Sequence, residues 1–148
     1  MELKEDVIKR RLEAFGIQPN KYRREILAYL ESARTHYHPT AAEVLDHLKQ
    51  KFPYVSQATV YNTLNLFLAK GLVLALQPEG NTVRYDATTG DHCHFVCENC
   101  GVMIDIPEKV LIGGKERRRI RNNTINRMVT YLFGICEQCQ EAHQAEAL

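Results

Sequence analysis

The segments Cys97-Glu98-Asn99-Cys100 and Cys136-Glu137-Gln138-Cys139 each hold two cysteines in the C-x-x-C spacing. This spacing sets two thiolates about one tetrahedral edge apart on a metal ion, so two such turns together supply four sulfur ligands. The pattern therefore predicts a closed, structural zinc site. The alternatives are two disulfides or a redox-active C-x-x-C motif.

The composition favours the metal over the disulfides. The chain has 148 residues, of which 45% are apolar and 25% charged, as in an ordinary globular protein. It starts without an apolar signal region, and no stretch approaches the roughly 18 apolar residues of a membrane span. We therefore expect a cytoplasmic protein, in a compartment where thiols stay reduced and paired cysteines more often bind metal.

The basic residues are unevenly distributed. Up to Gly71, 11 Lys and Arg face 8 Asp and Glu, whereas beyond it 8 bases face 10 acids. The first part is therefore the candidate for nucleic-acid binding. A difference of this size is equally typical of a solvated surface, so charge alone does not decide.

Four helices are predicted before Gly71, because apolar residues recur there at helical spacing. Asn20, Thr40 and Ser56 are expected to cap the second, third and fourth helices, and Thr40 with Glu43 matches a capping box. The strand-like runs 72–76 and 82–85 flank a turn cluster over 77–81 and predict a hairpin. Helices followed by a hairpin are typical of a winged helix-turn-helix domain.

The fourth helix has the features of a recognition helix. Val60, Leu64, Phe67 and Leu68 form its predicted buried stripe, and short polar side chains at its start suit contacts in the major groove. The predicted contact residues are Gln57, Thr59, Tyr61, Asn62 and Thr63. Phosphate contacts are expected from Lys21, Arg23, Arg24 and, on the wing, Arg84. The alternative is a capped amphipathic surface helix.

Histidine and aspartate residues gather around the first cysteine pair and indicate a second metal site. They are Asp86, Asp91, His92, His94 and Asp105. Nitrogen and carboxylate donors together suit Fe(II), Mn(II), Co(II) or Zn(II), so this site is interpreted as exchangeable and regulatory. The imidazoles of His92 and His94 are expected on opposite faces of an extended strand, so a turn is predicted there if both bind one ion.

The ordered motifs strongly resemble the ferric uptake regulator (Fur) family from about Pro19 to Cys139. They are His38-Pro39-Thr40-Ala41, Ser56-Gln57-Ala58-Thr59-Val60-Tyr61-Asn62, Arg84-Tyr85-Asp86, Asp91-His92-Cys93-His94, Cys97-Glu98-Asn99-Cys100-Gly101 and Tyr131-Leu132-Phe133-Gly134-Ile135-Cys136. The resemblance implies an α+β protein with a winged-helix DNA-binding domain over 1–86 and an α/β dimerisation domain over 87–148. It further implies a homodimer that binds palindromic operator DNA, with a regulatory metal bridging the two domains.

The resemblance also implies a set of regulatory ligands: His38, Asp86, His92, His94 and Asp105. Aspartate at both carboxylate positions is similar to the peroxide regulator (PerR) subgroup. Its members bind Fe(II) or Mn(II); peroxide oxidises a ligand histidine of the iron form, here His38 or His92, whereas the manganese form is insensitive. The alternative within the family is a regulator that reports iron or manganese availability without sensing peroxide.

Other interpretations remain beside this one. A metal-dependent enzyme is disfavoured because no additional general base is evident, and a zinc-ribbon module leaves His38 unexplained. Cys93 is interpreted either as a small buried side chain or as a soft donor or redox target. The helix expected after Pro107 contains Gly113-Gly114, which predicts that it is short or broken, and the basic run 115–121 is expected to be a solvated helical face.

Overall fold

The computed structural model describes residues 2–32, 38–78, 80–87, 92–107, 119–125 and 128–147. The chain divides into two compact units, Met1–Thr88 and Thr89–Leu148. The division lies two residues beyond the predicted boundary between 86 and 87. The DNA-binding and dimerisation roles expected of the two units remain predictions.

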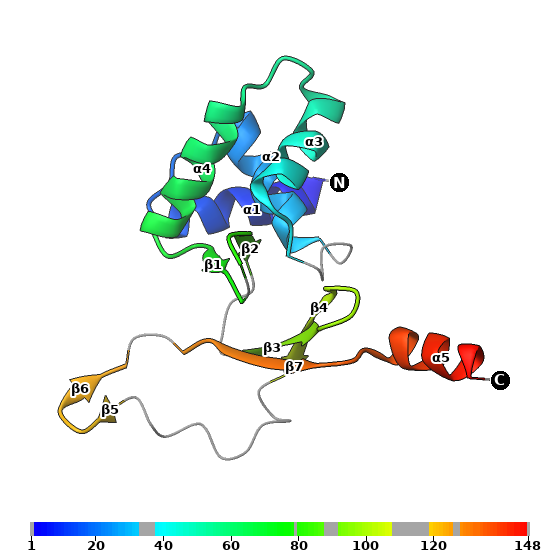
Figure 1. Cartoon of the computed structure of the whole chain (residues 1–148). Coiled ribbons are helices and arrows are strands. Elements are labelled where there is room, and N and C mark those ends of the chain that lie inside the picture. Colours follow the sequence, from blue (N-terminus) through cyan, green and yellow to red (C-terminus); the bar gives the residue numbers. More distant parts are fainter. Residues whose placement is uncertain are drawn as a thin grey trace. The chain divides into compact units, whose positions relative to one another are not determined.

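Four helices build unit 1 (Figure 1): α1 (Glu2–Ala14), α2 (Lys21–Glu31), α3 (Ala41–Lys51) and α4 (Gln57–Ala69). The three predicted caps are confirmed. The side chains of Asn20 and Ser56 accept hydrogen bonds from the third backbone N–H of α2 and α4, and Thr40 forms a complete capping box with Glu43. These caps satisfy backbone donors that a helix start otherwise leaves without a partner.

The core of unit 1 lies between the apolar stripes of these helices, with α2 packed against α1, α3 and α4. Leu12, Ile26, Leu48 and Phe67 are among its fully buried side chains. The predicted stripe of α4 is confirmed for Val60, Leu64 and Phe67, while Leu68 is only partly buried.

The predicted hairpin is present but shorter than expected. Strands β1 (Leu74–Leu76) and β2 (Arg84–Asp86) pair antiparallel, with Leu76 opposite Arg84 and Leu74 opposite Asp86. Leu72 and Val73 lie in the helical core instead of the hairpin, because the chain returns to the core directly after α4. Thr40 forms an isolated bridge with Arg84, which ties the segment before α3 to the wing.

A three-stranded sheet organises unit 2. Its central strand β3 (His92–Cys97) pairs antiparallel with β4 (Met103–Pro107) and parallel with β7 (Thr130–Gly134), and helix α5 (Glu137–Glu146) follows β7. A two-residue hairpin joins β5 (Arg119–Ile120) to β6 (Asn123–Thr124). With helices and sheets in both units, the α+β prediction is confirmed. None of the helices in the described ranges is long and apolar enough to cross a membrane.

Two expectations for the region after Pro107 have different outcomes. The short or broken helix around Gly113-Gly114 lies outside the described residues. The helical face expected over 115–121 is wrong for its last three residues, because Arg119 and Ile120 form β5 and Arg121 turns the chain with φ 56°. Across this tight turn Ile120 pairs with Asn123 and Arg119 with Thr124, and a helix does not allow such strand pairing.

Candidate metal centres

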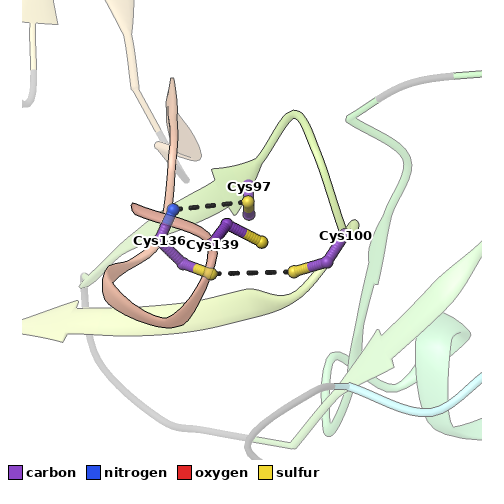
Figure 2. Close-up of side chains that lie close together, drawn as sticks. All are labelled: Cys97, Cys100, Cys136 and Cys139. Atoms are coloured by element: carbon purple, nitrogen blue, oxygen red, sulfur yellow. Dashed lines mark hydrogen bonds between the residues drawn. The ribbon is translucent and has the colours of Figure 1, made fainter. Parts of the chain in front are cut away.

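The four cysteines converge from two separate turns of unit 2 (Figure 2). Cys97 ends β3, and Cys100 lies in the turn to β4, where the Cys97 N–H donates to the Val102 carbonyl at 2.9 Å and the Gly101 N–H to the Cys97 carbonyl at 2.9 Å. Gly101 has φ 76°, a left-handed conformation that favours glycine. Cys136 is the N-cap of α5, and Cys139 lies in its first turn.

The sulfur geometry fits zinc. All four Sγ atoms lie within 4.8 Å of one another, and the Cys100 and Cys136 sulfurs are 3.7 Å apart. A tetrahedron with zinc–sulfur bonds of about 2.3 Å has edges of about 3.8 Å. A disulfide requires about 2.05 Å, and these cysteines are free. The cluster is therefore a four-thiolate site for structural zinc.

The surroundings of the thiols shift their pKa values in different directions. The backbone N–H groups of Cys100 and Cys136 lower the pKa of Cys97 to about 6. Cys139 accepts from the Asn99 amide at 3.1 Å, but the neighbouring sulfurs and burial prevail and raise its pKa to about 11. Cysteine binds zinc as the thiolate, and a nearby positive charge favours that deprotonated form. Zinc supplies that positive charge and displaces the remaining protons.

A second group of donors lies on the paired strands β3 and β4. The register sets His94 opposite Asp105, and their Nδ1 and Oδ1 atoms are 3.0 Å apart. The His92 Nε2 atom lies 3.7 Å from the same carboxylate oxygen. The turn expected between the two histidines is wrong: both lie on the continuous strand β3, with ring centroids 4.5 Å apart. Residues two apart in a strand share one face, so no turn is needed.

Two further donors meet within unit 1. The Nδ1 atom of His38 lies 3.5 Å from an Asp86 carboxylate oxygen, and both side chains are buried. Asp86 ends β2, and the segment after His38 is held beside this strand because the Tyr85 N–H donates to the Pro39 carbonyl at 3.0 Å. His38 and Asp86 are thus brought together by backbone pairing across a large sequence separation.

The five His and Asp residues supply three imidazoles and two carboxylates. This mixed donor set fits Fe(II) or Mn(II), because these ions accept nitrogen and oxygen ligands, whereas the thiolate cluster suits zinc. His92, His94 and Asp105 meet within unit 2, and His38 meets Asp86 within unit 1.

The model of the ferric uptake regulator family matches residues 15–131, most of the chain. The chain belongs to this family. The peroxide-responsive repressor PerR of Staphylococcus aureus is 35% identical over 144 residues, which cover 95% of this chain and 93% of that protein.

Comparison with solved structures supports the same family assignment. The peroxide stress regulator of Campylobacter jejuni is 29% identical with a TM-score of 0.69, over 94% of this chain and 100% of that one. The ferric uptake regulator of Pseudomonas aeruginosa with manganese is 28% identical with a TM-score of 0.70, over 88% and 98%. Members of the family are metal-dependent, DNA-binding transcriptional regulators, not enzymes. A metal-dependent repressor is the function that these similarities support for this chain.

On α4, the predicted base contacts of this Fur-family protein are partly exposed. Gln57 and Asn62 are exposed, Tyr61 is 41% exposed, and Thr59 is half-buried, with its hydroxyl 2.9 Å from that of Ser56. The prediction that Thr63 is exposed is wrong. Thr63 is buried because it lies three residues after Val60 and four before Phe67, on the apolar stripe of the helix.

Arg23 and Arg84, two of the predicted phosphate contacts, form hydrogen bonds within unit 1. An Arg23 Nη1 atom donates to the Gln18 carbonyl at 2.8 Å, and an Arg84 Nη1 atom donates to the His38 carbonyl at 3.1 Å. Tyr54 is fully exposed in the turn between α3 and α4.

Cys93 lies between the two histidines on β3 and is buried. Because neighbouring residues of a strand point to opposite faces, its side chain lies on the face away from the imidazoles. This placement agrees with the interpretation of Cys93 as a small buried side chain.

Proposed function

We propose that the chain is a homodimeric, peroxide-sensing repressor of the PerR type, whose regulatory ion controls its binding to palindromic operator DNA. The observation that carries the proposal is the His/Asp donor set, with an aspartate at both carboxylate positions, Asp86 and Asp105. The identity of 35% to the peroxide-responsive repressor of Staphylococcus aureus supports the same assignment.

In this proposal one Fe(II) or Mn(II) ion joins the two units. His38 and Asp86 bind it from unit 1, and His92, His94 and Asp105 bind it from unit 2. The ion would restrict how unit 1, the proposed DNA-binding unit, moves relative to unit 2. Since a ligand shifts an equilibrium only through its different affinity for the two states, the ion favours the arrangement that places two winged helices on paired half-sites.

Operator binding is assigned to α4 and its surroundings. Gln57, Thr59, Tyr61 and Asn62 are the proposed base contacts, because they lie in the first turns of a capped helix that follows α3 through a short turn. Arg23 and Arg84 are the proposed phosphate contacts on either side.

Dimerisation is assigned to unit 2. Among its described strands, β7 lies at an edge of the three-stranded sheet. Large apolar side chains on and beside β7 remain exposed, with Phe133 at 45% and Met128 at 49%. An open strand edge with apolar side chains is a surface that pairs readily with another chain. A second copy of unit 2 is the proposed occupant.

Bound Fe(II) would activate peroxide by transiently giving it an electron; overall, one oxygen atom of H2O2 would be inserted into a ring C–H bond of His38 or His92, and the other would leave as water. Mn(II) is a poor reductant for this reaction. The proposal therefore expects peroxide to release the iron-loaded protein from its operator and to leave the manganese-loaded protein bound.

The test compares operator affinity of the two metal forms before and after brief exposure to equimolar peroxide. We expect the iron form alone to lose affinity and to gain 16 Da on peptides that contain His38 or His92. His47 and His143, which lie outside the donor set, are internal controls and should stay unmodified. Equal responses of the two forms, or none, would reject peroxide sensing and leave a regulator of iron or manganese availability.

A further inference from the structure

His38 has an unusual backbone conformation. Its φ of 52° lies in the left-handed region, which residues other than glycine seldom occupy. His38 also precedes Pro39, and the ring of a proline restricts the backbone of the residue before it. Neither the backbone preference of histidine nor the following proline favours this conformation. Contacts with other residues must therefore stabilise the backbone of His38.

Arg84 supplies such a contact. One guanidinium nitrogen of Arg84 donates to the His38 carbonyl at 3.1 Å and lies 3.8 Å from a carboxylate oxygen of Glu43. The same Glu43 oxygen accepts from the Thr40 N–H at 2.7 Å. Arg84 therefore connects the carbonyl of His38 to the capping box that starts α3.

The position of Arg84 on β2 also relates it to Asp86. The two residues are two apart in the strand, so their side chains share one face of the hairpin. On that face His38 meets Asp86, and the Arg84 side chain is only 27% exposed. The guanidinium thus lies against the backbone of the residue whose imidazole reaches Asp86.

We propose that Arg84 is a positioning residue for the regulatory metal: by holding the His38 carbonyl, it keeps the His38 imidazole directed toward Asp86. The inference rests on the proposed function, because it takes His38 and Asp86 as ligands. It gives Arg84 a role that requires no DNA, beside the phosphate contact. Arginine suits this role since its rigid, planar guanidinium fixes the directions of the N–H groups on this one nitrogen, which the freely rotating ammonium of lysine does not reproduce.

The test measures Mn(II) affinity of the zinc-loaded protein without DNA. Loss of a residue that orients a ligand commonly lowers metal affinity by roughly 10- to 100-fold. We expect a loss of this size for Arg84→Gln and most of it for Arg84→Lys, which keeps the charge needed for a phosphate. Lys51→Gln is the matched control, because it removes a cation of unit 1 that bonds Glu25 instead, and it should bind Mn(II) like the wild type.

A double-mutant cycle with His38→Ala shows whether Arg84 acts through His38. In that background Arg84→Gln should cause no further loss of Mn(II) affinity. An equal loss in both backgrounds, unchanged Mn(II) affinity with weakened operator binding, or a lowered melting temperature of the zinc-loaded protein in both Arg84 variants would overturn the positioning role.

The cycle also separates the two proposals. If His38→Ala binds Mn(II) as the wild type does, the proposed regulatory site fails and the role of Arg84 fails with it. If His38→Ala weakens binding and neither Arg84 variant does, only the positioning role fails.

Discussion

Removal of zinc from the four-cysteine cluster is expected to unfold α5 while the helices of unit 1 stay folded. Cys139 is the one buried residue of α5 in the described part of the chain, and the Cys136 cap makes no side-chain hydrogen bond to the helix start. The packing that holds α5 in place is therefore the metal cluster itself.

The expected magnitude follows from the contacts of α5. Nucleating a helix costs about 4 kcal/mol, and a helix of 10 residues recovers little of this in water. Two hydrogen bonds partly offset this cost, at about 1 kcal/mol each. One runs from the Asn99 amide to the Cys139 sulfur, and the other from the Gln140 side chain to the Ile135 carbonyl. Burial of Cys139 adds about 1 kcal/mol. The metal-free helix is thus marginal, whereas structural zinc contributes on the order of 10 kcal/mol.

Amide hydrogen exchange measures this difference directly. In the zinc form, the α5 amides beyond the first turn should exchange more than about 100-fold slower than those of an unstructured peptide. After chelation, their exchange rates should lie within a few-fold of the rates of that peptide. Cys139→Ser should reproduce chelation, while Cys93→Ala, outside the cluster, should not. Slow exchange of α5 in protein shown by metal analysis to lack zinc would refute the reasoning.

Three further outcomes are expected. Phe67→Ala removes a fully buried ring from the core of unit 1 and should lower its stability by about 3–5 kcal/mol, seen as early unfolding of the α2–α4 amides while the zinc content stays unchanged. Burial opposes ionisation of Glu25, but its hydrogen bonds with Lys51 and His47 prevail and hold its pKa below 4.5. Glu25→Gln should therefore cost about 0.5 kcal/mol above that pH, and the difference should vanish in denaturation curves as the pH falls through the lowered pKa. Tyr61→Ala should weaken operator binding by about tenfold or more without changing Mn(II) affinity; equal operator affinity would remove Tyr61 from the proposed interface.

The sequence alone was sufficient to predict features that depend on residues close together in the chain. The C-x-x-C pairs determine sulfur separation within each turn, and the side chains of Asn20, Thr40 and Ser56 cap the helices that directly follow them. The donor types alone also distinguished a thiolate site from a His/Asp site. These properties depend on short-range spacing or on residue type, both of which the amino-acid order specifies.

Tertiary structure decided what depends on pairing between distant segments. Strand register, not spacing, set Asp105 opposite His94, and backbone pairing with β2 brought His38 to Asp86. Thr63 is buried although it is polar, because the width of the apolar stripe depends on what packs against α4. The contact of Arg84 with the His38 carbonyl has no local signal at all, since a guanidinium can reach any acceptor that the fold brings near it.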